Sequence, residues 1–325
     1  MQSVNILEVE SLSVRFGESS AKAVEEISFG LAKGETLGIA GESGSGKTAS
    51  ILSILGLLQR ATVEGSAKFE GQELIGAGNK LLNRIRGKRI GLVLQDPFAA
   101  LDPVQTVGYQ ISEGLRANGW SKKRAMRHSI QLLEEVGVPS APQRVNAYPH
   151  QFSGGMRQRV VIAMALAQDP DVLIADEPTT ALDVRIQKQV LDLMKQQCEN
   201  RGMSLIVITH DLGIISHYTD RIIIMYAGKI VEESTRLKLF DQPLHPYTQG
   251  LLDCLPQIGS NGNDYLKTIR GQPPILGQLP SGCRYHPRCS FAESACTYGP
   301  HPPLIPIKWG RSACIQLDKF LDKSA

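Results

Sequence analysis

The 325-residue sequence has no long apolar run, and its first residues do not have the pattern of a signal peptide. Its longest apolar stretches, such as Val160 to Ala167 and Ile222 to Ala227, fall well short of the ~18 to 20 residues that a membrane-spanning helix needs. Met1 to Glu10 has neither the basic start nor the apolar block of a signal peptide. We therefore expect a chain that remains in the cytosol and does not cross a bilayer alone.

The sequence also lacks a strong excess of one charge, since its net charge is only +3. The one concentration of basic residues, Lys122 to Arg127, is followed by apolar residues at helical spacing, which is typical of the solvated face of an amphipathic helix. No basic stripe, internal repeat or low-complexity block is present, and we expect no nucleic-acid partner. The 42% hydrophobic content indicates one large core or two smaller ones.

A phosphate-binding motif is present in the octapeptide GESGSGKT, Gly41 to Thr48, which matches G-x-x-x-x-G-K-[ST] at every fixed position. It lies between an apolar run, Thr36 to Ala40, and an apolar helical stretch, Ile51 to Leu58. A Gly/Ser-rich loop that matches by chance rarely has these neighbours. We expect Lys47 to reach the β- and γ-phosphates and the Thr48 hydroxyl to ligate Mg²⁺. The expected nucleotide contacts come from Gly41, Ser43, Gly44, Ser45, Gly46, Lys47 and Thr48, and none from Ala49.

Apolar patterning predicts an α/β fold. Leu12 to Phe16 alternates, as a half-buried antiparallel strand does, whereas Val172 to Ala175 and Leu205 to Ile208 are continuous apolar runs typical of buried parallel strands. The segment about 97–168 is helix-like, and Leu115 to Gly137 is its clearest helix. From Leu244 the chain is rich in Pro and Gly, which predicts a separate C-terminal appendage.

An acidic pair, Asp176-Glu177, directly follows the predicted strand Val172 to Ala175. Ligands of open α/β sheets bind at the carboxyl ends of the strands, so we expect these carboxylates at the phosphate site. Asp176 would hold Mg²⁺ through water, and Glu177 could orient or deprotonate the attacking water. The alternative is an acidic pair that simply ends a strand.

A second anion site is predicted where Ser153-Gly154-Gly155 precedes an apolar helical run, because Ser153 can cap that helix and the glycines leave its first amides open. The ordered set of motifs then resembles an ATPase subunit of the ABC transporter family over Leu7 to about Glu233. The set also includes Gln95, the segment Ala181 to Asp183, and His210.

This resemblance implies a P-loop NTPase with a RecA-like parallel-sheet core, an N-terminal antiparallel β-subdomain and an inserted helical subdomain. It implies that Gln95 senses the metal and the water, and that His210 contacts the γ-phosphate. Phe16 would stack on adenine, although a core strand residue is an equal alternative. The signature Ser153 to Gly155 would close over the ATP of an opposite subunit, so that two such domains work head to tail, and Asp183 at the ATP site would belong to the segment that communicates across that dimer.

Further segments, among them Tyr148-Pro149-His150, His245 to Thr248 and Pro280 to Cys283, resemble the ATPases of dipeptide and oligopeptide permeases. The implied domains are 1–243 for nucleotide binding and 244–325 for the C-terminal region. The implied function is ATP hydrolysis that energises peptide import, or alternatively import of nickel, metallophores or glutathione. The implied partners are two membrane permease subunits, a second ABC ATPase, expected to be a paralogue, and an extracytoplasmic solute-binding protein. The implied location is the cytoplasmic face of the inner membrane, as a peripheral subunit.

Cysteine is scarce, and no C-x-x-C pair is present, so the usual zinc-ribbon pattern is missing. Four of the six cysteines lie in the appendage: Cys283, Cys289, Cys296 and Cys314. Four thiolates can hold a [4Fe–4S] cluster, and tails similar to this one have been assigned one in the family it resembles. Zinc and reduced thiols remain alternatives. His286 and His301 could replace a ligand, although we expect both to be solvated loop histidines.

Other classes of ATPase fit less well. A soluble DNA-repair or chromosome-organising ATPase has a similar head domain but carries long coiled-coil insertions, and no heptad pattern occurs between Thr48 and Ser153. Translation factors of this kind carry two ATPase domains in one chain. A catalytically dead binding module would not be expected to retain Lys47, Asp176, Glu177 and His210 together.

Overall fold

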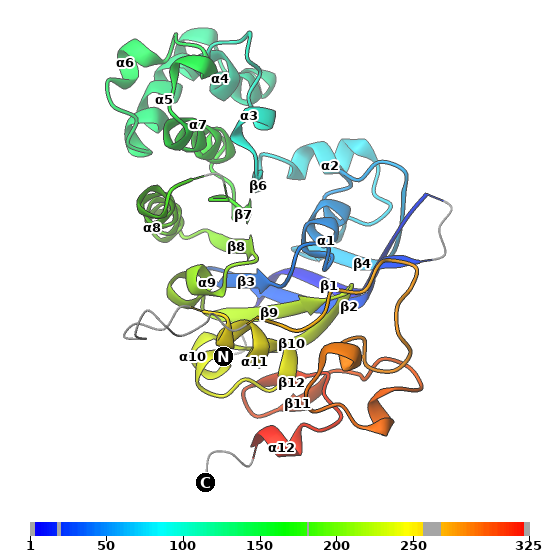
Figure 1. Cartoon of the computed structure of the whole chain (residues 1–325). Coiled ribbons are helices and arrows are strands. Elements are labelled where there is room, and N and C mark those ends of the chain that lie inside the picture. Colours follow the sequence, from blue (N-terminus) through cyan, green and yellow to red (C-terminus); the bar gives the residue numbers. More distant parts are fainter. Residues whose placement is uncertain (1–3, 18–20, 181, 256–267, 322–325) are drawn as a thin grey trace, which may run out of the picture. The chain divides into compact units, whose positions relative to one another are not determined.

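The computed structural model describes residues 4–17, 21–180, 182–255 and 268–321. The chain divides into two compact units. Their helices and strands are labelled in Figure 1. The first unit contains residues 32–35 and 77–208, and the second contains residues 4–31, 36–76 and 209–325. No helix within the described ranges combines the length and the apolar character required to span a bilayer.

The first unit has a parallel sheet. β7 (Val172–Asp176) lies between β6 (Ile90–Val93) and β8 (Ser204–Thr209), with Ala175 of β7 opposite Val93 and Val207. Every residue of β7 and β8 is buried, which explains why both strands are continuously apolar in sequence. The predicted parallel core strands are confirmed.

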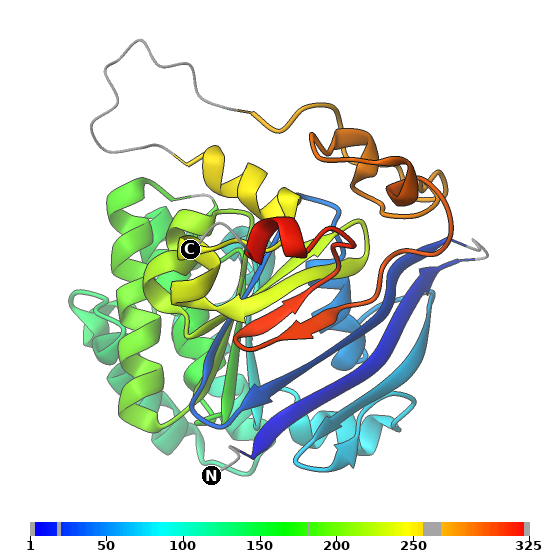
Figure 2. The ribbon, with the colours of Figure 1, turned by 90° about the horizontal axis from the view of Figure 1, so that it is seen from below.

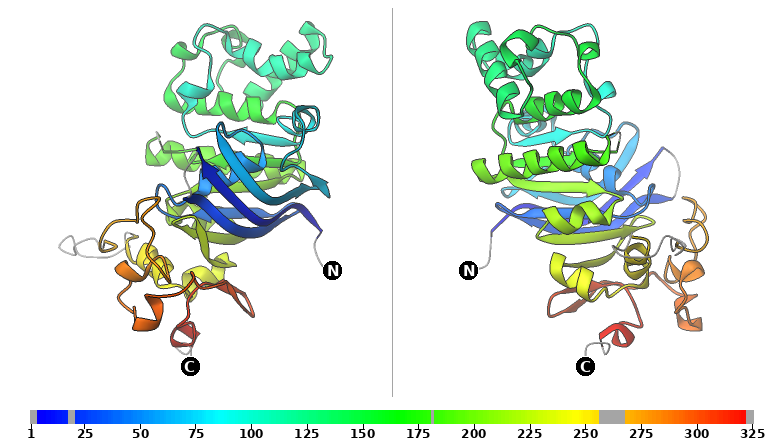
Figure 3. Two further views of the ribbon diagram at one scale, coloured as in Figure 1. Left: turned by 90° about the vertical axis from the view of Figure 1, so that its right-hand side faces the viewer. Right: turned by 60° about the vertical axis from the view of Figure 1, so that its left-hand side comes forward.

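Helices fill the chain between β6 and β7, where we expected a helical insertion, and they group together in Figure 3. They are α3 (Pro97–Ala100), α4 (Val107–Ala117), α5 (Lys122–Glu135), α6 (Ala141–Arg144), the 3-10 turn η1 (Pro149–Gln151) and α7 (Gly154–Leu166). Outside this group, the unit contains α2 (Asn79–Ile85) and α8 (Val184–Arg201).

The prediction of one helix over Leu115 to Gly137 is wrong, because the chain turns between α4 and α5. Gly119 has φ +88°, a left-handed conformation that glycine adopts without strain. Ser121 then accepts a hydrogen bond from the Arg124 N–H at 3.3 Å and caps the start of α5. A local cap and a left-handed residue thus interrupt an apolar pattern that continues through both helices.

The second unit contains the N-terminal antiparallel sheet, whose long strands are dark blue in Figure 2. The strand order is β2 (Lys22–Ala32), β1 (Asn5–Phe16), β4 (Ala61–Phe69) and β5 (Gln72–Glu73). β1 pairs with β4 from Leu7 opposite Phe69 to Phe16 opposite Ala61, with a register shift after Glu10. This confirms the predicted N-terminal β-subdomain.

Five further paired strands of this unit form the part of the larger sheet that carries the phosphate loop and the C-terminal strands. Its order is β3 (Thr36–Ala40), β9 (Arg221–Tyr226), β10 (Lys229–Thr235), β12 (Gly310–Ser312) and β11 (Ile305–Ile307). Only the β3–β9 pair among these described strands is parallel. The C-terminal tail is therefore continuous with this sheet (Figure 2, red).

The helices of the second unit are short. They are α1 (Lys47–Ile54), α9 (Leu212–Tyr218), α10 (Arg236–Asp241), α11 (Pro246–Asp253), α12 (Asp318–Leu321) and the 3-10 turns η2 (His286–Arg288) and η3 (Ser294–Cys296). Three tyrosines, Tyr226, Tyr247 and Tyr285, pack ring against ring, with centroids 4.7 to 5.3 Å apart. These rings join β9, α11 and the tail into one core.

Candidate functional site

The predicted phosphate loop connects β3 to α1, as its motif requires. Gly41 has φ +149°, and a Cβ there would lie 2.1 Å from the Met225 carbonyl oxygen. Gly46 has φ +101°, and its Cβ would lie 2.8 Å from the Ala23 carbonyl oxygen. Both positions require glycine because the loop packs directly on backbone carbonyls.

Lys47 is buried, and its ammonium group binds the loop itself. The Nζ donates to the carbonyl oxygens of Gly41 at 2.7 Å and Glu42 at 2.9 Å, and to Ser45 Oγ at 3.4 Å. The Thr48 side chain lies in the first turn of α1 and is exposed. The lysine is thus held at the start of a helix whose N-terminus favours anions.

Two long-range contacts hold the loop at Glu42, and sequence reasoning missed both. The Glu42 N–H donates to the Tyr247 hydroxyl at 2.9 Å. The Glu42 carboxylate accepts two hydrogen bonds from the Arg288 guanidinium, at 2.6 and 2.9 Å. Glu42 occupies a variable position of the motif, so the motif gave no reason to select this residue. The sequence feature that came closest to predicting these contacts was the H-P-Y-T segment, which contains Tyr247.

In the first unit, the structure brings Gln95 and Glu177 together. Gln95 follows β6, Glu177 follows β7, and the Gln95 Nε2 donates to the Glu177 Oε2 at 2.9 Å. The Thr180 hydroxyl donates to the same oxygen at 3.0 Å, a contact that sequence reasoning missed. Glu177 also has φ +45°, a strained conformation for a residue with a side chain. Asp176, the last residue of β7, is buried.

The predicted S-G-G segment opens α7. Ser153 accepts a hydrogen bond from the Met156 N–H at 3.4 Å and caps the helix, as expected. A Cβ on Gly155 would lie 2.7 Å from Ile186 Cγ2, so this position also packs against α8. Asp183 caps α8 by accepting from the Arg185 and Ile186 N–H groups at 3.1 and 3.0 Å. Ala181, part of the same predicted segment, lies outside the described residues.

Phe16 and His210 lie in the second unit with the phosphate loop. Phe16 ends β1 with 38% of its surface exposed, so its interpretation as a core residue is wrong. His210 is exposed directly after β8, and Asp211 caps α9 by accepting from the Gly213 N–H at 2.7 Å.

The four tail cysteines line one small cavity, of about 20 Å³, together with His245, His286 and other, mostly apolar side chains. All four are free thiols. Burial raises the pKa of Cys283 and Cys289, and raises that of Cys314 to about 12. Within the described ranges, no three His, Cys, Asp or Glu side chains form a group that could hold one metal ion.

Neither tail histidine that we considered is simply solvated. His286 lines the cysteine cavity. His301 accepts a hydrogen bond from the Arg284 N–H at 3.3 Å, and burial, reinforced by the nearby Arg284 charge, lowers the pKa of its imidazole to about 3. Our expectation of solvated loop histidines was therefore wrong. The two histidines are partly shielded from solvent because the tail packs against β2 and β10.

The glycine loop after β3 and the acidic residues that end β7 define the class of P-loop nucleoside triphosphatases. The family models of the ABC transporter and of the oligopeptide/dipeptide transporter C-terminal region match residues 24–180 and 231–296. The oligopeptide transport ATP-binding protein OppD of Haemophilus influenzae is 45% identical over 319 residues, covering 97% of this chain and 98% of that protein. A putative peptide import ATP-binding protein of Brucella abortus is 44% identical over 318 residues, covering 96% of this chain and 95% of that protein.

Among solved structures, the dimeric post-hydrolysis state of the ATP-binding cassette MJ0796, bound to ADP and Pi, is similar with a TM-score of 0.63. It is 28% identical in sequence, and the match covers 71% of this chain and 98% of that chain. The chain belongs to the ABC transporter family and is one of its ATPases.

Proposed function

We propose that this chain hydrolyses ATP to energise the import of peptides through a separate membrane permease. The observation that carries the proposal is the match to peptide import ATP-binding proteins over nearly the full chain, C-terminal region included. Import of nickel, metallophores or glutathione by the same mechanism is the alternative, because the ATPase of a transporter does not touch the cargo.

In the proposed ATP site, each of the residues described above has a separate role. Lys47 and the N–H groups of Gly41 to Thr48 bind the phosphates, and Phe16 stacks on adenine. Thr48, Gln95 and Asp176 hold Mg²⁺, which when bound neutralises developing phosphate charge. His210 contacts the γ-phosphate. The signature Ser153, Gly154 and Gly155 closes over the ATP of an opposite subunit, and the segment of Asp183 communicates across that dimer.

Glu177 is the proposed general base. Its carboxylate is oriented by Gln95 and Thr180, which both donate to one oxygen, and this fixed orientation suits a group that accepts a proton from water. The positive φ of Glu177 supports this role, since strained backbone concentrates at functional sites. Gln95 would also report the state of the γ-phosphate to the helical segment α3 to α7, where we propose that a cytoplasmic helix of the permease docks.

The proposed assembly contains two permease subunits, a second ABC ATPase that is a paralogue, and an extracytoplasmic solute-binding protein, at the cytoplasmic face of the membrane. The proposed domains are residues 1–243 and 244–325. The match to a C-terminal region family from residue 231 supports a boundary in this part of the chain.

We propose that Cys283, Cys289, Cys296 and Cys314 hold a [4Fe–4S] cluster. The four free thiols line one cavity together with apolar neighbours such as Phe291. Each cysteine of such a cluster binds a different iron, so the sulfurs need not be as close as the ligands of one ion. The cluster would supply folding energy to a tail that has little apolar core of its own.

Cargo identity is tested by uptake into cells that lack this gene and are complemented with the wild-type chain. Labelled di- and oligopeptides, Ni²⁺ and glutathione are offered separately at equal concentrations. We expect restored uptake of peptides only. Restored uptake of Ni²⁺ or glutathione without peptides would contradict the peptide assignment, while leaving the ATPase assignment intact.

A further inference from the structure

Glu42, the second residue of the phosphate loop, is bound through its N–H, its carbonyl oxygen and its carboxylate. Its N–H donates to Tyr247 at 2.9 Å. Its carbonyl oxygen accepts from the Lys47 ammonium at 2.9 Å and from the Ser45 N–H at 3.2 Å. The position of Glu42 therefore helps to set the position of Lys47, which the loop carbonyls hold.

The carboxylate of Glu42 is held by a residue 246 positions later, Arg288 in the tail. Two parallel hydrogen bonds, Nη1 to Oε2 at 2.6 Å and Nη2 to Oε1 at 2.9 Å, form a bidentate pair. The Arg288 side chain is 5% exposed and that of Glu42 is 25% exposed. The Arg288 Nε also donates to the Arg270 carbonyl oxygen at 2.9 Å, which fixes the direction of the guanidinium.

This pair has an electrostatic consequence for the loop. A carboxylate at the second position of a phosphate loop repels a bound nucleoside triphosphate, because both are anionic. The buried Arg288 neutralises that carboxylate, and lysine could not reproduce the two-pronged geometry. Burial alone lowers the pKa of Arg288, but the hydrogen bonds to Glu42 and Tyr226 outweigh it, so the guanidinium remains charged.

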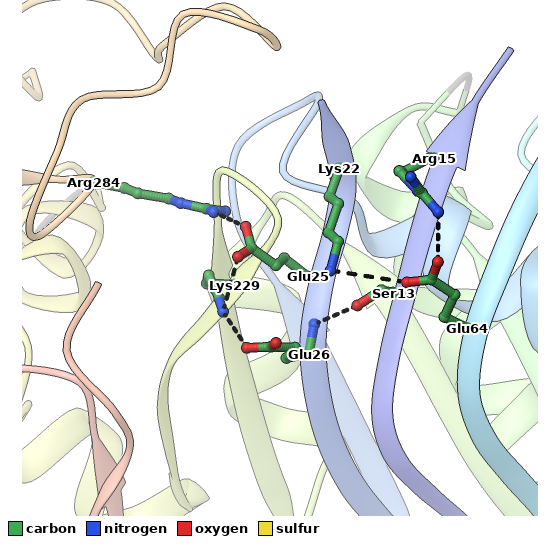
Figure 4. A network of polar contacts seen from close by, with 8 residues as sticks. All are labelled: Ser13, Arg15, Lys22, Glu25, Glu26, Glu64, Lys229 and Arg284. Atoms are coloured by element: carbon green, nitrogen blue, oxygen red, sulfur yellow. Dashed lines mark hydrogen bonds and ion pairs between the residues drawn. The ribbon is translucent and has the colours of Figure 1, made fainter. Parts of the chain in front are cut away.

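Arg288 is not what attaches the tail to the rest of this unit. In Figure 4, Arg284 reaches from the tail to Glu25 on β2. Arg311 on β12 pairs with Glu233 on β10. Loss of the Arg288 side chain would leave these attachments, and the strand pairing of the tail, in place.

We propose that Arg288 is a positioning residue for ATP binding, which acts by holding and neutralising Glu42 in the phosphate loop. This inference rests on the proposed role of that loop in binding ATP. The C-terminal region is then a structural part of the nucleotide site within the same chain.

The test is a double-mutant cycle on the full chain, with Kd for Mg-ATP, KM and kcat as readouts. Arg288→Gln removes the charge, Glu42→Gln removes its partner, and the third variant carries both changes. Since hydrogen bonds between charged groups are worth ~1.5 to 3 kcal/mol, we expect Arg288→Gln to raise Kd and KM about tenfold or more. We expect kcat to change by less than about threefold, because ground-state binding is what is lost. Arg288→Lys should recover part of the affinity.

The matched control is Arg311→Gln, which breaks a tail pair that does not touch the loop and should leave Kd unchanged. In the double variant, the factor by which Kd rises should be smaller than the product of the factors in the two single variants. Any of three results would overturn the inference: an unchanged Kd in Arg288→Gln, increases in Kd that simply multiply in the double variant, or an equal increase in Kd in Arg311→Gln.

Lys47→Ala distinguishes failure of this inference from failure of the proposed role of the loop in binding ATP. If it loses ATP binding while Arg288→Gln does not, only this inference fails; if it binds normally, the proposed role of the loop fails. If Arg288→Gln does not fold, the Arg288→Lys and Glu42→Gln cycle gives the same decision.

Discussion

At the scale of single residues, Glu177 combines a strained backbone with a side chain that is held by two hydrogen bonds. Its φ is +45°, and both Gln95 and Thr180 donate to one carboxylate oxygen. A residue that merely ended a strand would need neither feature. The arrangement favours a carboxylate that must keep one orientation during a reaction.

We predict that Glu177→Gln binds Mg-ATP normally but hydrolyses it ~10² to 10⁴ times more slowly, which is the usual contribution of a general base. The amide keeps an oxygen that can accept from Gln95 and Thr180, so the shape is preserved. Single-turnover hydrolysis and equilibrium nucleotide binding check this. Lys47→Ala is the contrasting variant and should lose binding itself. Turnover near the wild-type rate would remove Glu177 from the mechanism.

A second residue-scale prediction concerns pH. Glu232 is fully buried on β10, where its carboxylate accepts from the Leu244 and His245 N–H groups, each at 2.9 Å. Burial raises the pKa of Glu232 from 4.5 to about 7. Between these values the folded state holds a proton that the unfolded state has released, so the free energy of unfolding falls as pH rises.

The free energy of unfolding can fall by about 3 kcal/mol as Glu232 loses its proton, because each unit of pKa shift is worth ~1.36 kcal/mol. We therefore predict that Glu232→Gln becomes more stable relative to wild type as pH rises from 4.5 to 7.5. Urea unfolding at a series of pH values measures the difference. A difference that stays constant over this range would show that Glu232 does not titrate there.

At the scale of elements, the phosphate loop offers two glycines in unlike surroundings. A Cβ on Gly41 would lie 2.1 Å from the Met225 carbonyl oxygen, whereas Gly44 has φ +78° and no atom within 4 Å of its Cβ position. We predict that Gly44→Ala costs ~1 kcal/mol of unfolding free energy through backbone strain alone. Gly41→Ala should cost over 2 kcal/mol more, because a backbone carbonyl cannot move aside cheaply. Equal losses in urea unfolding would contradict this packing.

The cysteine cavity is the second element that can be tested alone. We predict that anaerobically purified protein is brown and contains about four iron and four sulfide per chain, and that Cys289→Ser reduces both. Cys254→Ser is the matched control, since Cys254 is a free thiol that does not line the cavity. Zinc in place of iron, or full iron content in Cys289→Ser, would contradict the cluster assignment.

Sequence reasoning succeeded at the elements whose signal is local. The G-x-x-x-x-G-K-T loop, the continuous apolar strands and the Ser153 cap were predictable because their residues are neighbours in the chain. It failed between α4 and α5, where Gly119 and Ser121 break an apolar period that continues on both sides. It also assigned the tail histidines to solvent, because burial of a Pro- and Gly-rich segment depends on contacts with distant strands.

At the scale of the whole molecule, the structure confirms the predicted fold class. It also contains long-range contacts that the sequence did not predict. The contacts of Glu42 with Tyr247 and Arg288 join residues more than 200 positions apart, and no spacing rule encodes them. They matter because they place the C-terminal region against the phosphate loop. The family assignment, in contrast, followed from the order of short motifs and is confirmed by relatives that match nearly the whole chain.

ATP-driven peptide uptake in proteoliposomes tests the central claim most directly. The vesicles would contain this chain with its two permease subunits and partner ATPase, with the solute-binding protein on the opposite side. We predict that labelled peptide accumulates against a gradient only when Mg-ATP is supplied on the side of this chain, and that Glu177→Gln in this chain strongly reduces uptake while leaving assembly intact. Wild-type uptake without ATP, or with Glu177→Gln at the wild-type rate, would contradict the account.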